Sequence, residues 1–246
     1  MSAPLRRLST PPWPELRLLC VPHAGGSASA FRTWPPGLPP AVEVWAAQPP
    51  GRGPRLGETP FETHDEVVAE LAGALPDDDL PLALFGHSLG ALIAFHLARE
   101  LRRRDRPAPR LLVVSAREAP QLPHPGEHVH ALPDDGVVDA VRRYGGTPAE
   151  VFEEPELVEL ALPSLRADFR ISETTEYVPE EPLDLPIVAI GGIDDPDVTR
   201  EDLEAWREQT AAGFRMQLFA GGHFFFEAAE PAVLQLLARE LALVLA

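Results

Sequence analysis

The chain has 246 residues, 45% of them hydrophobic, which is enough apolar material for a buried core and excludes disorder throughout. Its 38 acidic and 21 basic side chains give a net charge of −17, so we expect no nucleic-acid partner. The apolar runs are too short to cross a membrane, residues 1–16 lack the apolar region of a secretory signal, and the single cysteine, Cys20, excludes an internal disulfide framework, so we expect a soluble, cytoplasmic enzyme.

Short apolar runs alternate along the chain with stretches of helical periodicity. Because both faces of each run are apolar, the runs predict strands buried in a parallel sheet, and the alternation predicts right-handed crossovers. The sequence thus indicates an α/β fold on a mostly parallel, doubly wound sheet. The predicted strands are residues 16–21, 42–46, 82–85, 111–115, 187–190 and 216–219. The predicted helices are residues 64–75, 91–104, 200–209 and 231–245, the third of them capped by Thr199.

The alternation of strand and helix stops between about residues 118 and 183. This stretch has helical patterns at 134–144 and 154–169 but no run typical of a strand. Helices inserted between two strands of such a sheet lie above its carboxyl edge, where ligands bind. We therefore predict a helical lid, residues 119–182, inserted into a core of residues 1–118 and 183–246. Helical decoration without a covering role is the alternative.

A candidate nucleophile, Ser88, lies in the segment Gly-His-Ser-Leu-Gly at residues 86–90. The bare G-x-S-x-G pattern is common by chance, but here a predicted buried strand precedes it and a predicted helix follows it. Such a strand–turn–helix lifts the serine hydroxyl above the sheet, and the glycines permit close backbone approach. An ordinary serine in a glycine-rich turn is the alternative.

A serine hydroxyl attacks efficiently only when a histidine accepts its proton and a carboxylate orients that histidine. His223 directly follows the last predicted strand, at the same edge of the sheet as Ser88. The preceding strand is followed by Asp194, Asp195 and Asp197; the local spacing favours Asp195, with Asp194 as the rival. The resulting order of Ser88, Asp195 and His223 is the chain order of the α/β-hydrolase triad.

Two backbone N–H groups are candidates for stabilising the oxyanion of an acyl-transfer reaction. Leu89 N–H lies at the expected start of a helix, directly after the serine. The glycine-rich loop after the first core strand supplies the second donor, for which we favour Ala24 N–H over that of Gly25. A phosphate-binding role for this loop is the weaker hypothesis, since it has neither G-x-G-x-x-G nor a Walker lysine.

Five other histidines are not expected to act in catalysis. His124, His128 and His130 cluster in a proline-rich stretch, but no cysteine or carboxylate accompanies them at ligand spacing, so we expect no metal site. His87, inside the serine motif, and His96, in the following helix, are expected to be packed or hydrogen-bonded. Cys20 is expected to be a small core residue.

Taken together, these motifs resemble those of one family, the stand-alone (type II) thioesterases of polyketide and nonribosomal peptide synthetases in the α/β-hydrolase superfamily. The likeness extends from about Leu18 to Phe226, with one departure at Pro49, where the family often has a bulkier residue. It is carried by residues 22–27 (Pro-His-Ala-Gly-Gly-Ser), 48–53 (Gln-Pro-Pro-Gly-Arg-Gly) with Arg55, 86–90, 165–170 (Leu-Arg-Ala-Asp-Phe-Arg), 191–196 and 221–225.

The resemblance implies hydrolysis of an acyl thioester from the phosphopantetheine arm of an acyl or peptidyl carrier protein, as an editing step that removes aberrant acyl groups. It implies a transient carrier partner, no cofactor of the enzyme's own and no membrane contact, and we expect a monomer. Without the resemblance, the residues alone indicate only a serine hydrolase that acts on an acyl compound. A general carboxylesterase, an acyltransferase and a non-catalytic carrier-binding protein remain as alternatives.

Substrate and carrier contacts are predicted at two places. Leu157, Leu160, Ala161 and Phe169 have roughly helical spacing and are expected to roof an acyl pocket or else simply to pack on the core; Phe224, beside His223, is included as a substrate contact. The arginines expected to dock an acidic carrier, because their loops lie near the carboxyl edge of the sheet, are Arg32, Arg52 and Arg55. The arginine run at 102–106 is instead expected to stabilise a helix end.

Overall fold

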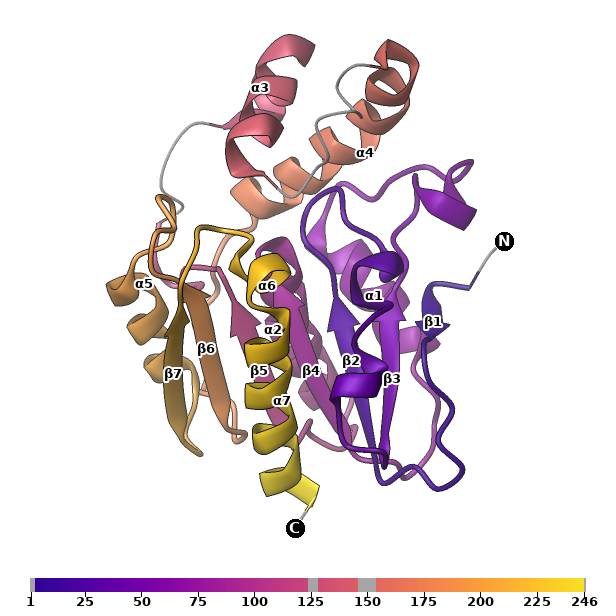
Figure 1. The fold of residues 1–246 in the computed structure, drawn as a ribbon, viewed down its shortest axis with the longest axis vertical. Coiled ribbons are helices and arrows are strands. Elements are labelled where there is room, and N and C mark those ends of the chain that lie inside the picture. The colour runs from indigo at the N-terminus through magenta and orange to yellow at the C-terminus, as the bar shows by residue number, and fades with distance from the viewer. Residues whose placement is uncertain (1–2, 124–127, 146–153, 246) are drawn as a thin grey trace.

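The computed structural model describes residues 3–123, 128–145 and 154–245. A seven-stranded sheet has the order β1-β3-β2-β4-β5-β6-β7, and all neighbours pair in parallel except β1, which is antiparallel to β3 (Figure 1). The predicted mostly parallel sheet is therefore confirmed. The strands are β1 (Leu5–Arg7), β2 (Leu16–Val21), β3 (Val42–Ala47), β4 (Leu82–His87), β5 (Leu111–Ser115), β6 (Ile187–Gly192) and β7 (Phe214–Phe219).

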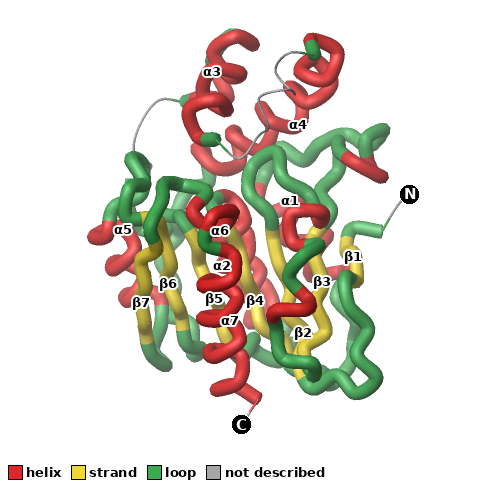
Figure 2. Tube along the Cα trace, in the orientation of Figure 1, coloured by secondary structure: helices red, strands yellow, loops and turns green. Residues whose placement is uncertain are grey.

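Helices cover both faces of the sheet (Figure 2). Alternate residues of one strand enter different clusters: Leu19 packs in the cluster that includes α1, α2 and Trp206, whereas Leu18 and Cys20 pack in the cluster that includes α7 and Trp34. Cys20 is thus the buried core residue that the sequence predicts. The helices are α1 (His64–Ala74), α2 (Leu89–Arg103), α3 (Asp134–Tyr144), α4 (Pro155–Thr174), α5 (Arg200–Glu204), α6 (Phe225–Ala228) and α7 (Glu230–Leu245).

The ends of the predicted helices agree with the structure to within two residues, with two larger differences. Thr199 caps α5 and forms a capping box with Asp202, but α5 ends at Glu204 and a 3₁₀ turn, Ala205–Gln209, completes the predicted segment. Helix α4 runs to Thr174, five residues beyond the predicted end. Among the described residues, no helix is long and apolar enough to cross a membrane.

The helical insertion, α3 and α4, connects β5 to β6 and lies above one end of the sheet (Figure 1). It has a small apolar cluster of its own, in which Val137 and Val141 of α3 pack with Phe169 of α4. Arg102 and Arg103 lie in the last turn of α2, as expected for a helix end, and both also pair with the distant Glu180.

Several histidines are packed inside the fold, as expected for His87 and His96. Burial, reinforced by the positive charges of His64 and Arg99, lowers the pKa of His96 to about 3. Burial likewise lowers the pKa of His23 to about 4 and that of His87 well below its usual value. In an unfolded chain these imidazoles titrate near pH 6.5. Between about pH 6.5 and 4 the unfolded state therefore binds protons that the folded state does not.

We predict that the free energy of unfolding falls as the pH drops from 6.5 toward 4, and that His96→Gln makes this fall shallower. Each proton taken up only on unfolding contributes about 1.4 kcal/mol per pH unit, and the contribution is absent above pH 6.5. Urea unfolding at a series of pH values measures the slope. His128→Gln, which replaces an exposed imidazole, is the control. Identical slopes for wild type and His96→Gln would contradict the prediction.

Candidate active site

Ser88 lies in the sharp turn between β4 and α2, with φ of 54° and ψ of −117°. The turn requires its flanking glycines, since a Cβ on Gly86 would lie 2.1 Å from the carbonyl oxygen of Gly90. A Cβ on Gly90 would likewise lie 2.1 Å from the carbonyl oxygen of Val21, at the end of β2. The structure thus gives the G-x-S-x-G segment the strand–turn–helix geometry of a nucleophile elbow, with a non-glycine residue held at positive φ.

His223 lies in the loop after β7, and its Nδ1 is 2.9 Å from Oδ2 of Asp195. The carboxylate of Asp195 is fully buried, and its other oxygen accepts the backbone N–H groups of Asp197 and Val198 at 3.0 and 3.3 Å. This network fixes the orientation of Asp195 and leaves Nε2 of His223 as the ring nitrogen available to a nucleophile. Asp194, the rival for this position, is exposed, so His223 pairs with the favoured aspartate.

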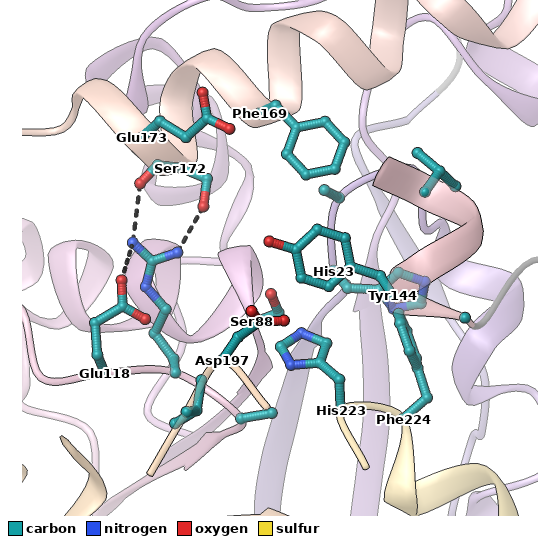
Figure 3. Close-up of a pocket in the computed structure, with 16 residues that line it drawn as sticks. His23, Ser88, Glu118, Tyr144, Phe169, Ser172, Glu173, Asp197, His223 and Phe224 are labelled. Atoms are coloured by element: carbon teal, nitrogen blue, oxygen red, sulfur yellow. Dashed lines mark hydrogen bonds and ion pairs between the residues drawn. The ribbon is translucent and has the colours of Figure 1, made fainter. Parts of the chain in front are cut away.

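Ser88 and His223 line the same cleft, which is partly open to solvent. Figure 3 shows the His223 ring turned toward Ser88, with Tyr144 and Phe169 on the opposite side of the space. The cleft therefore lies between the core and the helical insertion, with the two predicted reactive side chains at its floor. Its other lining residues are His23, Ala24, Ala116, Arg117, Glu118, Val141, Gly145, Ser172, Glu173, Asp197, Val198 and Phe224.

Of the two residues predicted to donate to the oxyanion, Leu89 directly follows Ser88 in the chain and Ala24 lines the same cleft. Leu89 is the first residue of α2, where backbone N–H groups have no acceptor within the helix. The N–H of Gly25, the second choice in the same loop, donates to Oδ2 of Asp168 at 2.7 Å. Because that N–H is already engaged, the structure favours Ala24 as the donor from this loop.

Tyr144, the last residue of α3, is a lining residue that the sequence does not single out. Its ring centroid is 5.5 Å from that of His223 and 6.0 Å from that of Phe169. Burial, together with the carboxylates of Asp197, Glu173 and Glu118, raises the pKa of Tyr144 to about 12. The hydroxyl therefore remains protonated at neutral pH and is a hydrogen-bond donor to any acceptor in the cleft. Its place at the end of a predicted insertion helix, next to Gly145, is the signal that could have identified it.

A buried polar group forms one side of the cleft. The guanidinium of Arg117 donates to Oγ and the carbonyl oxygen of Ser172, at 2.6 and 2.9 Å, and pairs with Glu118 at 3.3 Å (Figure 3). These contacts join the segment after β5 to helix α4. The sequence gives no indication of this group, because Arg117 and Ser172 are separated by 55 positions.

The predicted substrate contacts divide between two cavities. Phe169 and Phe224 line the cleft at Ser88, as expected. Leu157, Leu160 and Ala161 instead line a second cavity, among α3, α4 and the loop at Gly51–Gly53, and the first two are about half exposed. Leu160 therefore does not line the cleft at Ser88, and its contact with an acyl group stays a prediction. Phe169 lies more than two helical turns further along α4, which places it over the floor of the cleft.

Two of the three predicted docking arginines are buried in ion pairs. Arg52 binds the carboxylate of Asp168 through two nitrogens, at 2.5 and 2.9 Å. Arg55 binds the carboxylates of Glu58 and Glu70. A guanidinium held in this way is not available to a carrier protein, so the predicted docking role of Arg52 and Arg55 is corrected. Arg32 is exposed, and its docking role stays a prediction.

The histidine cluster acquires a carboxylate that the sequence does not indicate. His128, His130 and Glu173 have ligand atoms within 4.8 Å of one another, while His124 lies outside the described residues. Both oxygens of Glu173 already accept hydrogen bonds, from the backbone N–H groups of Val129 and His130, and the His130 ring is 2.5 Å away. This carboxylate therefore anchors the start of the insertion to α4.

A thioesterase domain model matches residues 16–241, which is most of the chain. The chain belongs to the thioesterase domain family. It is 41% identical to the gramicidin S biosynthesis protein GrsT of Aneurinibacillus migulanus, over 94% of this chain and 91% of that protein. The RedJ thioesterase of the prodiginine pathway in Streptomyces coelicolor has a TM-score of 0.88 at 39% identity, over 94% and 92% of the two chains.

The type II thioesterase BorB of the borrelidin cluster is equally similar in structure, with a TM-score of 0.88 at 40% identity, over 100% of this chain and 98% of that one. These neighbours confirm the predicted α/β-hydrolase fold and the resemblance to type II thioesterases.

We predict that Gly90→Ala greatly reduces any activity that depends on Ser88 and lowers the melting temperature, because the new methyl group would collide with the carbonyl oxygen of Val21. Gly73→Ala is the matched control, since its Cβ would meet nothing within 4 Å. Gly73 lies in the last turn of α1, so this change should leave the stability unchanged or raise it by less than about 1 kcal/mol. Thermal unfolding and Ser88 labelling by a fluorophosphonate measure the two effects; normal labelling of Gly90→Ala would contradict the steric account.

Proposed function

We propose that this chain is a serine thioesterase that hydrolyses acyl groups from the phosphopantetheine arm of carrier proteins. The observation that carries the proposal is the placement of Ser88, on a nucleophile elbow, in one cleft with a His223–Asp195 pair joined at 2.9 Å. Membership of the thioesterase domain family supports the thioester as the bond that is cleaved.

The mechanism follows from the roles of these groups. The Ser88 hydroxyl attacks the thioester carbonyl carbon while Nε2 of His223 accepts its proton, and buried Asp195 stabilises the resulting imidazolium. The negative oxygen of the tetrahedral intermediate accepts the N–H groups of Ala24 and Leu89. The intermediate collapses with loss of the pantetheine thiol, which takes the proton from His223. Water, deprotonated by His223, then attacks the acyl-serine, and His223 returns the proton to the Ser88 oxygen as the acid is released.

The carrier-bound substrate and the editing role are supported by the relatives. GrsT is described as a gramicidin S biosynthesis protein, RedJ as a thioesterase of the prodiginine pathway, and BorB as a type II thioesterase of the borrelidin cluster. By analogy, we propose a transient complex with an acyl or peptidyl carrier protein, in which the substrate brings its own phosphopantetheine. The enzyme then needs no cofactor, since its own side chains perform each step.

We predict that a short acyl group is hydrolysed faster from a holo carrier protein than from a pantetheine thioester or an oxygen ester. Release of free thiol or acid from the three forms, compared as kcat/KM, measures the preference. Ser88→Ala is the control and should abolish turnover with the melting temperature preserved. Faster hydrolysis of the oxygen ester, without any gain from the carrier, would make the protein a general esterase.

We predict that Asp195→Asn lowers kcat by about 10⁴-fold, whereas Asp194→Asn leaves it within about twofold. The amide cannot stabilise the imidazolium and favours the wrong tautomer of His223, as expected for an acid of a Ser-His-Asp triad. The neighbouring Asp194 is exposed and provides a control with the same chemical change. Steady-state hydrolysis of a pantetheine thioester distinguishes them, and similar losses in both variants would reject Asp195 as the acid.

A further inference from the structure

The carboxylate of Asp168, on helix α4 of the insertion, contacts the loop that holds the proposed oxyanion donor. Its Oδ2 accepts the N–H of Gly25 at 2.7 Å and also binds Arg52, whose two terminal nitrogens lie 2.5 and 2.9 Å from the carboxylate oxygens. Arg52 in turn donates to the carbonyl oxygen of Gly26 at 3.2 Å. The ion pair thus binds the backbone of two successive loop residues: Asp168 accepts the N–H of Gly25, and Arg52 donates to the carbonyl oxygen of Gly26.

Helix α4 also packs directly on the glycines of two loops. A Cβ on Gly25, where φ is +77°, would lie 2.7 Å from Cδ2 of Leu165. A Cβ on Gly51, which also has φ of +77°, would lie 3.2 Å from Cβ of Ser164. Both contacts come from the turn of α4 that precedes Asp168. Because Gly25 and Gly51 have no side chains, α4 lies close enough for the carboxylate of Asp168 to reach the loop at Gly25.

These contacts constrain the peptide groups on which oxyanion stabilisation depends. The N–H of Gly25 belongs to the peptide unit that begins at the carbonyl of Ala24, so holding it restricts the backbone of Ala24. The carbonyl of Gly26, held by Arg52, restricts the loop on the other side. Without Asp168 the N–H of Gly25 would lose its acceptor, and buried Arg52 would lose its partner, so the loop would no longer have one preferred conformation.

We propose that Asp168 is a positioning residue for the oxyanion hole, so that the hole is complete only while helix α4 is docked on the core. The inference rests on the proposed function, because it takes Ala24 N–H as an oxyanion donor. It assigns the Leu-Arg-Ala-Asp-Phe-Arg segment a role in the chemical step in addition to covering the cleft. Asp168 acts through the loop and does not itself touch the substrate.

The test compares Asp168→Ala with Asp168→Asn in the full chain. Alanine removes the acceptor for Gly25 N–H, whereas the asparagine carbonyl oxygen can still accept it. We expect Asp168→Ala to lower kcat for a pantetheine thioester about 10²-fold, with KM changed less than threefold, as for loss of an oxyanion donor. Asp168→Asn should recover a large part of this loss. Full kcat in Asp168→Ala, or no difference between the two variants, would overturn the proposal.

A matched control separates positioning from general stability. Glu43, in β3, forms a buried ion pair with Arg17 at 2.9 Å, away from the cleft. Glu43→Gln removes a buried charge that pairs with both Arg17 and Arg7, while Arg17 keeps Asp78 as a second partner, so it should lower the melting temperature while kcat stays within twofold. All assays are run well below the melting temperature of every variant. A loss of kcat in Glu43→Gln as large as that in Asp168→Ala would show that Asp168 acts only through stability.

A loss of oxyanion stabilisation weakens a ligand that mimics the tetrahedral intermediate more than a ligand that does not. A general loss of stability would not discriminate between the two. A trifluoromethyl ketone analogue of the thioester adds to Ser88 and places an oxyanion in the hole, whereas a thioether analogue binds without it. In Asp168→Ala the inhibition constant of the ketone should rise in step with the loss of kcat, and thioether binding should stay the same. Equal weakening of both ligands would overturn the proposal.

Assays with p-nitrophenyl acetate, an oxygen ester, allow the positioning role of Asp168 to be tested separately from the proposed thioesterase function. If the wild type cleaves the nitrophenyl ester through Ser88 but no thioester, the thioesterase proposal fails, and the Asp168 variants are still compared on the ester. If the wild type cleaves thioesters and Asp168→Ala is equally fast, only the positioning role fails.

Discussion

The site depends on a close crossing between the start of α2 and the end of β2. The crossing is possible only because Gly90 has no side chain, and it brings the carbonyl oxygens of Val21 and Pro22 against the helix. Ser88 is thereby lifted out of the sheet at positive φ. The same contact brings the loop that follows β2 to the serine, so that Ala24 lies at the cleft. One steric constraint thus places both the nucleophile and the loop that is proposed to stabilise its oxyanion.

A buried ion pair, Arg52–Asp168, connects this floor to the insertion above it. Arg52 and Asp168 are each about one-tenth exposed, and removing two charges from water has a cost that their attraction does not reliably exceed. Such a pair is weak evidence for added stability. An apolar pair of the same volume, however, could not provide the bidentate geometry or the hydrogen bonds to two backbone groups. The ion pair is therefore best understood as a device for orientation.

The sequence predicted the features that are determined locally. The six longer strands were recognisable from their apolar runs, as was the order of Ser88, Asp195 and His223. Strand β1 was missed because it has only three residues, two of them exposed arginines. The residues that depend on distant partners were predicted least well. Arg52 meets Asp168 across 116 positions, and no local pattern indicates whether such an arginine faces solvent or a buried carboxylate.

The wall and the floor of the cleft come from different parts of the chain. Strand ends and the elbow supply Ser88, Asp195 and His223, whereas α3 and α4 supply Tyr144 and Phe169. Substitutions on the insertion can therefore change which acyl groups fit without moving the three residues proposed for the chemistry. In evolutionary terms, the insertion provides a region in which substrate range can diverge between pathways while the reaction is retained. Residues that connect the insertion to the core, such as Asp168, are not free to vary in this way.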